Sequence, residues 1–221
     1  MISALQKELV YTPMVRVYKN VFLSILTSFL TILAIYANPP LFQLLYTGPM
    51  LWVSLLAPLP IIMIASWILS KDTSPVVGYS AFLTVAASIG IMTGPAVLHA
   101  SLSSVSSAFV GAGVLFGAMA TYGAYTQRDL SGMRDFLMVG LIAIIVAGLI
   151  NIFVMSSVAN LVISSIAILV FLGFTAYDVQ RTQEMLSYGS DTNLELLCAL
   201  NLYMDFVNLF INLLNVIESS D

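Results

Sequence analysis

The sequence predicts an all-α polytopic membrane protein, a bundle of seven transmembrane helices with the C-terminal helix at its centre. Of the 221 residues, 60% are hydrophobic and 8% are charged, whereas soluble domains carry about 25% charged residues. Three long segments, 20–70, 73–127 and 136–177, contain no Asp, Glu, Lys or Arg. Their apolar runs are continuous rather than alternating, which argues against a transmembrane β-barrel. We expect a single transmembrane domain over residues 1–221.

Each uncharged segment is about twice as long as one transmembrane helix, which needs roughly 20 residues. Each also has a helix-breaking or polar turn near its middle, such as Asn38-Pro39-Pro40 in the first. We therefore interpret each segment as a pair of antiparallel helices, and a further apolar stretch near the C-terminus supplies the seventh. The expected helices are roughly 21–37, 51–69, 76–98, 105–125, 136–155, 161–184 and 194–217.

Residues 1–19 precede the first helix and contain no long apolar run. They predict a short cytoplasmic arm. The apolar run that follows ends at Ala37 and is longer than the 7–15-residue core of a cleaved signal peptide. We therefore expect a retained first helix.

The basic residues predict the orientation. All of them fall on one side of the seven expected helices, and the three turns on the opposite side have none. Because cytoplasmic loops are enriched in Lys and Arg, the N-terminus should be inside. The C-terminus, with Glu218 and Asp221, should be outside. The basic residues are Lys7, Arg16, Lys19, Lys71, Arg128, Arg134 and Arg181.

The seventh helix carries a carboxylate, Asp205, near its middle, together with a polar stripe. The stripe residues recur at spacings of 4, 3, 4 and 3, which places them on one face of an α-helix. A carboxylate at the bilayer centre costs about 2.5–3.5 kcal/mol on insertion scales, so this face should meet protein or water. The alternative interpretation is helix packing through buried amides. The stripe consists of Asn201, Asp205, Asn208, Asn212 and Asn215.

A second carboxylate, Asp178, lies near the cytoplasmic end of the sixth helix. The sixth and seventh helices are consecutive, so Asp178 and Asp205 are expected within about one turn of each other. Two acids that close in a low-dielectric site would share a proton and respond to pH as a pair. When charged, they also offer the hard oxygen ligands that Ca²⁺ prefers. Alternatively, Asp178 pairs locally with Arg181 three residues on.

Other site types find little support. The net charge of −4 is diffuse and no basic patch exists, so nucleic acid is not an expected partner. The chain has one histidine, His99, and one cysteine, Cys198, which argues against a histidine-based zinc site. Gly113 and Gly117 form a GxxxG pattern that predicts close helix packing inside the bundle.

Four short motifs resemble the signature of the Bax inhibitor-1 family. They are Tyr177-Asp178 in the sixth helix, LYMDFVNLF at 202–210 in the seventh, Asp129-Leu130-Ser131 after the fourth, and Asn151-Ile152-Phe153 in the fifth. The resemblance covers nearly the whole chain. It implies a seven-helix fold with the last helix in the centre.

The resemblance also implies a function. Bacterial members of the family are described as pH-sensitive calcium leak channels, whose paired aspartates correspond to Asp178 and Asp205, and eukaryotic members suppress cell death. Relatives carry a basic cluster, including an arginine, at the cytoplasmic end of the second helix. This chain has only Lys71 there, and a lysine lacks the bidentate fork of arginine. Lys71 and Arg181 are therefore the candidate gate partners.

We accordingly expect a calcium leak channel in a bacterial inner membrane, gated by the aspartate pair. It would be monomeric, with lipid, protons and Ca²⁺ as partners, no required cofactor and no enzymatic activity. Asp178 and Asp205 are the candidate Ca²⁺ ligands. The candidate pore-lining residues are Asn201, Asn208, Asn212 and Asn215.

Two alternatives remain open at this point. The first is a regulator that does not transport but binds a membrane protease or a cell-death or stress protein in the membrane. The second is an intramembrane aspartyl protease, which would also use two membrane aspartates to activate water. Those proteases carry Gly-x-Gly-Asp in the seventh helix, whereas this chain has Leu202-Tyr203-Met204-Asp205.

Overall fold

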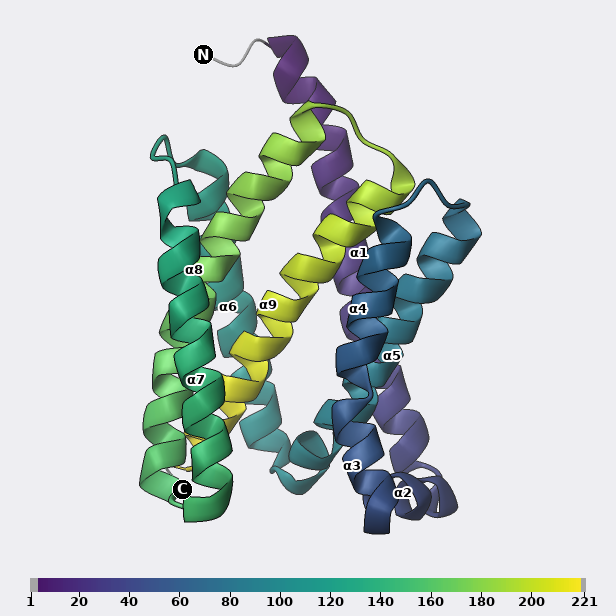
Figure 1. The fold of residues 1–221 in the computed structure, drawn as a ribbon, viewed down its shortest axis with the longest axis vertical. Helices are drawn as coiled ribbons and strands as arrows, with labels where there is room; N and C mark the ends of the chain where they lie inside the picture. Colours follow the sequence, from purple (N-terminus) through teal and green to yellow (C-terminus); the bar gives the residue numbers. More distant parts are fainter. Residues whose placement is uncertain (1–3, 220–221) are drawn as a thin grey trace. The chain divides into compact units, whose positions relative to one another are not determined.

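The computed structural model describes residues 4–219, with side chains from residue 10 onward (Figure 1). Over this range the chain forms helices and connecting turns, without any β-strand. Seven helical segments are long and apolar enough to cross a membrane. The predicted all-α membrane bundle with seven spans is therefore confirmed. Asp221, at the predicted outer end, lies outside the described residues.

The last five spans match the predicted helices to within four residues at each end. Their boundaries follow from local capping chemistry. The Ser101 hydroxyl accepts a hydrogen bond from the Ser104 N–H at 3.0 Å, and Asp191 Oδ1 accepts one from the Leu194 N–H at 3.0 Å, as N-caps do. These helices are α5 (Pro75–His99), α6 (Leu102–Tyr125), α7 (Arg134–Val154), α8 (Ser157–Ser187) and α9 (Thr192–Glu218).

The first helix is longer than predicted. Helix α1 covers Ala4–Tyr36 without interruption, so the described part of the expected arm 1–19 continues the membrane helix rather than preceding it. Residues 4–9 are strong helix formers, and the helix continues through Pro13. The apolar span within it begins at Val10. The side chain of Lys7 lies outside the described residues.

The segment around the second predicted helix, 51–69, divides into three helices: α2 (Pro39–Tyr46), α3 (Gly48–Leu56) and α4 (Pro58–Leu69). The expected turn at Asn38-Pro39-Pro40 begins a helix instead of only ending one. Asn38 Oδ1 accepts a hydrogen bond from the Leu41 N–H at 3.3 Å, and proline suits the first turn of a helix. Helices α3 and α4 together form the second span.

The chain groups into two compact units. One comprises the described residues up to His99 together with Met185–Tyr203, and the other comprises Ala100–Glu184 and the described residues from Met204 onward. Helix α9 contributes its first half to one unit and its second half to the other. The single domain expected from the sequence stays a prediction.

In the first unit, α5 packs against both α1 and α4 (Figure 1). Gly90 permits the close approach of α1, because a Cβ there would lie 2.7 Å from the Ser28 carbonyl oxygen. The buried Ser28 hydroxyl donates to the Ala86 carbonyl at 2.7 Å. It also lies 2.5 Å from the hydroxyl of the buried Tyr203 in α9. Together these contacts join α1, α5 and the first half of α9.

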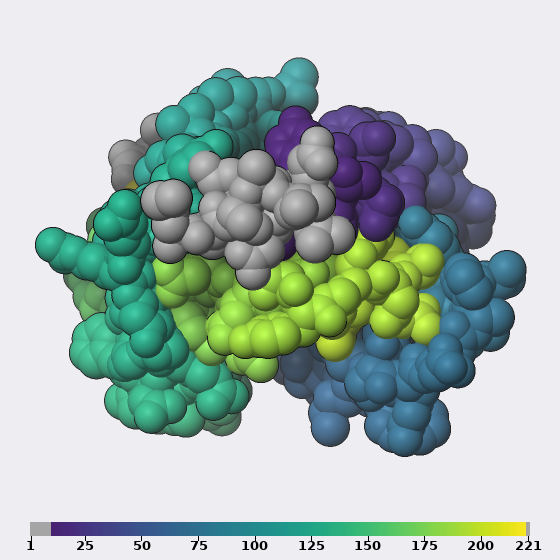
Figure 2. Space-filling view, turned by 90° about the horizontal axis from the view of Figure 1, so that it is seen from above, coloured from purple at the N-terminus to yellow at the C-terminus, as the bar shows by residue number. Residues whose placement is uncertain are grey.

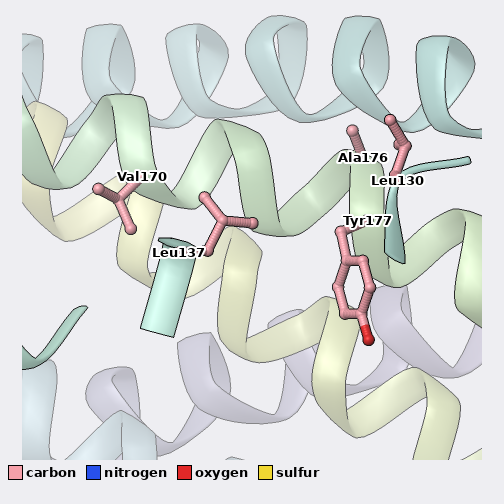
Figure 3. Packing of buried hydrophobic residues seen from close by; sticks show 5 residues of the cluster. All are labelled: Leu130, Leu137, Val170, Ala176 and Tyr177. Carbon is pink, nitrogen blue, oxygen red and sulfur yellow. The ribbon is translucent and has the colours of Figure 1, made fainter. Parts of the chain in front are cut away.

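In the second unit, α7 and α8 pack through a cluster of buried residues (Figure 3). Gly123 of α6 lies against the Ala176 backbone of α8, where a Cβ would clash. Gly113 and Gly117 behave differently from the prediction: both are exposed, and a Cβ at either would meet nothing within 4 Å. The buried cluster consists of Leu130, Leu137, Val170, Ala176 and Tyr177.

Helix α9 is the most buried of the spans. In its most apolar stretch 61% of the residues are buried, against 50% or less in each of the other six. Phe206 of α9 contributes to this burial, because its ring packs edge-on against Phe109 and Phe116 of α6. This burial agrees with the prediction that the C-terminal helix is enclosed by its neighbours.

Candidate functional site

The structure places both predicted aspartates in the second unit. Asp205 belongs to α9 and Asp178 to α8. Asp178 lies nine residues before the end of α8, or about 13 Å along the helix axis. The two carboxyl groups are close enough to interact electrostatically. The sequence order suggests the same proximity, and the role of the two aspartates as a pH-sensing pair stays a prediction.

Asp205 occupies an unusual environment. Its residue exposure is 4%, and its Oδ2 atom has no hydrogen-bond partner among the described residues. Buried polar atoms without a partner are uncommon and costly, and they often mark functional positions. Asp178 is half-buried by comparison. The site therefore joins a fully enclosed carboxyl group to one with partial access to the surface.

Two arginines act on Asp178. Arg181, on the same helix, and Arg134, the first residue of α7, both interact with it electrostatically. Arg181 also donates a hydrogen bond from Nη1 to the Tyr177 hydroxyl at 3.1 Å. Arg181 was a predicted partner. Arg134 was used in the sequence only for topology, and its position after the Asp129-Leu130-Ser131 motif is the signal that points to it.

Lys71, the other predicted gate partner, belongs to the first unit. Its Nζ lies 5.2 Å from the centre of the Trp67 ring, within cation–π range. Its backbone carbonyl accepts a hydrogen bond from Asn193 Nδ2 at 3.2 Å, and the carbonyl and hydroxyl oxygens of Thr73 accept from the same nitrogen. Figure 2 shows the segment between α4 and α5 beside the beginning of α9. The gating role of Lys71 stays a prediction.

Two asparagines of the polar stripe hydrogen-bond to the backbone of their own helix. Asn208 Nδ2 donates to the Met204 carbonyl and Asn212 Nδ2 to the Asn208 carbonyl, each at 2.8 Å. Their side-chain oxygens are the groups left to face an ion. Asn215 is half-buried, whereas Asn201 is exposed and belongs to the first unit. The pore-lining role of the four residues stays a prediction.

A pure carboxylate metal site is absent from the described part of the chain. No group of three or more His, Cys, Asp or Glu side chains there is arranged to hold a metal ion. Ca²⁺ takes 6–8 oxygen ligands, and Asp178 and Asp205 supply at most four. Amide oxygens and water would have to complete any calcium shell at this pair.

A cavity of about 110 Å³ lies between the last turns of α8 and the loop that follows α6. Gln180 holds the adjoining loop, because its Oε1 accepts from the Leu130 N–H at 2.8 Å and its Nε2 donates to the Arg128 carbonyl at 2.9 Å. The sequence does not single out Gln180. The lining residues are Asp129, Ser131, Tyr177, Gln180, Arg181 and Glu184.

The Asp129 carboxylate at this cavity is held by its own loop. The Ser131 N–H donates to Asp129 Oδ1 at 2.8 Å. Hydrogen bonds from the Ser131 backbone and hydroxyl lower the pKa of Asp129 below its ordinary value. Asp129 therefore stays ionised at neutral pH and fixes the turn between α6 and α7.

Comparisons with known proteins show which proteins this chain is similar to. A family model described as "Inhibitor of apoptosis-promoting Bax1" matches residues 11–221. The inner membrane protein YbhL of Escherichia coli K12 is 31% identical over 181 residues, which cover 79% of this chain and 77% of that protein. An uncharacterized membrane protein of Streptococcus pyogenes serotype M3 is 31% identical over 201 residues, which cover 89% and 87%.

An uncharacterized protein of Caulobacter vibrioides is 30% identical over 170 residues, which cover 73% of this chain and 66% of that protein. The family match includes all of α2 to α9 and therefore the two aspartates, both arginines that act on Asp178, and the Asp129 loop. The chain therefore belongs to the Bax inhibitor-1 family, as its seventh-helix and loop motifs predict.

Proposed function

We propose that the protein is a pH-sensitive calcium leak channel in which Asp178 and Asp205 sense pH. The observation that supports this most strongly is the buried carboxyl group of Asp205, with an unpaired oxygen and a second carboxyl group nearby. An ionisable group inside a transmembrane helix is costly and is usually retained for an ion or proton pathway. Helix packing alone would be satisfied by an asparagine at this position.

The pair would work through its shared proton. At high pH both carboxylates are charged, and a bound cation or a nearby positively charged side chain relieves their repulsion. Arg134 and Arg181 are the cationic side chains that interact electrostatically with Asp178 in the second unit. Lys71 is a further candidate for this role. At low pH the pair holds a proton, so Ca²⁺ loses a charged ligand and the electrostatic attraction between Asp178 and the arginines weakens.

The side-chain oxygens of the stripe are the next ligands along the helix. Asn208 and Asn212 follow Asp205 by one and two turns, and their amide nitrogens are held by the helix backbone. This arrangement orients the amide oxygens, which are suitable ligands for Ca²⁺. We infer that the ion is passed along the second half of α9.

The membrane and orientation are part of the same proposal. The E. coli relative is named an inner membrane protein, and we infer the corresponding bacterial membrane for this chain. The distribution of the basic residues supports a cytoplasmic position for the Asp178 end of α8. The pH sensor would then respond to the cytoplasm.

The direct test is calcium flux in liposomes. Purified protein would be reconstituted with a calcium-sensitive dye inside, and dye fluorescence would be followed after external calcium is added at several pH values. Empty liposomes are the control. We expect protein-dependent influx that changes with pH. Absence of influx at every pH would reject the channel and favour the non-transporting regulator.

A further inference from the structure

Helix α5 contains a proline in its interior, Pro95, four residues before its end. Proline has no N–H, so the carbonyl four residues earlier loses its usual helical donor. That carbonyl belongs to Ile91. A buried carbonyl without a donor is costly, and in membrane helices the freed group is usually satisfied by a neighbouring side chain.

The donor is supplied by Tyr46, the last residue of α2. Its hydroxyl donates a hydrogen bond to the Ile91 carbonyl oxygen at 2.8 Å. The ring of Phe42 supports the Tyr46 ring in an edge-on contact, with centroids 5.1 Å apart. Gly94 leaves the space that this approach needs, because a Cβ at that position would clash with the Tyr46 hydroxyl.

The hydroxyl keeps its proton over the whole physiological range. Burial raises the pKa of Tyr46 to about 12, and only the protonated phenol donates to a carbonyl. A further hydrogen bond joins α2 to α3. The Leu45 carbonyl accepts a hydrogen bond from the Ser54 hydroxyl of α3 at 2.9 Å.

We propose that α2 is a latch on the proline break of α5, with the Tyr46 hydroxyl in place of the N–H that Pro95 lacks. The sequence makes this segment look like an exposed turn between two spans. In the structure it carries Tyr46, whose hydroxyl reaches the orphan carbonyl. The latch lies within the first unit and is independent of the aspartate pair.

The test is hydrogen–deuterium exchange of the purified protein in detergent, read on the peptide that covers α2. Tyr46→Phe removes only the hydroxyl. We expect it to speed exchange of α2 about threefold, the ratio equivalent to the ~0.6 kcal/mol average of interhelical hydrogen bonds in a membrane protein. In the Pro95→Ala background, the backbone N–H at position 95 can again donate to the Ile91 carbonyl. Tyr46→Phe should then have almost no effect on the exchange of α2.

Two further variants complete the design. Gly94→Ala should speed exchange of α2 as Tyr46→Phe does, because its methyl group displaces the hydroxyl, and the two changes together should add nothing more. Tyr36→Phe, at an exposed tyrosine of α1, is the matched control and should leave α2 unchanged. Equal exchange with Tyr or Phe at position 46, or a threefold effect that persists in Pro95→Ala, would overturn the latch.

Discussion

Arg16 of α1 and Glu195 of α9 form a two-pronged ion pair. Arg16 Nε donates to Glu195 Oε2 at 2.7 Å, and Nη2 donates to Oε1 at 2.6 Å. The Glu195 side chain is 6% exposed and the Arg16 side chain 49%. The pair therefore fixes the beginning of α9 to α1 in the first unit, with the buried charge on the glutamate.

This asymmetry predicts unequal costs for the two partners. Arg16→Met leaves a buried carboxylate without its cation and should lower the free energy of unfolding by about 1–3 kcal/mol. Glu195→Gln leaves the exposed arginine to water and should cost less. Unfolding of the purified variants in detergent by heat or SDS measures both. Equal costs would show that burial of Glu195 does not set the energy of the pair.

The glycines of α6 provide a second prediction with an internal control. Gly123→Ala places a methyl group against the Ala176 backbone, which cannot yield as a flexible side chain does. We expect a loss of about 1–3 kcal/mol of stability. Gly113→Ala has open space and should be neutral or gain up to about 1 kcal/mol in helix propensity. The same unfolding assay measures the stability of both variants. An equal loss of stability in Gly113→Ala and Gly123→Ala would contradict the close packing of α6 at Gly123.

The raised pKa of Tyr46 predicts a dependence on alkaline pH. Between pH 10 and 12 the unfolded chain loses this proton while the folded chain keeps it. The stabilising contribution is therefore complete below pH 10 and is lost as pH rises through 12. The stability advantage of the natural chain over Tyr46→Phe should stay constant up to pH 10 and then shrink. An advantage unaffected by pH up to 12 would contradict the buried, hydrogen-bonded hydroxyl.

The orientation is testable without purification. Because every basic residue falls on one side of the predicted spans, we expect the N-terminus inside and the C-terminus outside. Alkaline phosphatase fused after Asp221 should be active, and green fluorescent protein fused there should not fluoresce. The opposite pattern would refute the orientation and the cytoplasmic position of the pH sensor.

The sequence predicted the spans well where a capping residue precedes an apolar helix, as at Ser101 and Asp191. It did not predict α2, because eight residues are too few to show helical periodicity and Pro39-Pro40 can end a helix or begin one. It also placed the end of the arm at residue 19, whereas the described part of the arm belongs to α1, which continues through Pro13.

Packing details were harder to predict because both faces of a membrane helix are apolar. The GxxxG pattern at Gly113 and Gly117 has the same spacing as Gly90 and Gly94, yet only the latter pair is closely packed. Spacing alone does not tell which face turns inward. The two aspartates were found by their charge within apolar helices. Arg134 was not assigned to the site, since its approach to Asp178 depends on the fold of the loop before α7.

The measurement that tests the central claim most directly is the pH profile of calcium flux in liposomes for Asp178→Asn and Asp205→Asn. Because a coupled pair titrates as a unit, each single variant should remove most of the pH dependence, and the double variant should remove little more. Asp72→Asn, the same change at an exposed aspartate, should keep the natural profile. If both single variants also keep it, the aspartate pair is a structural feature and does not sense pH.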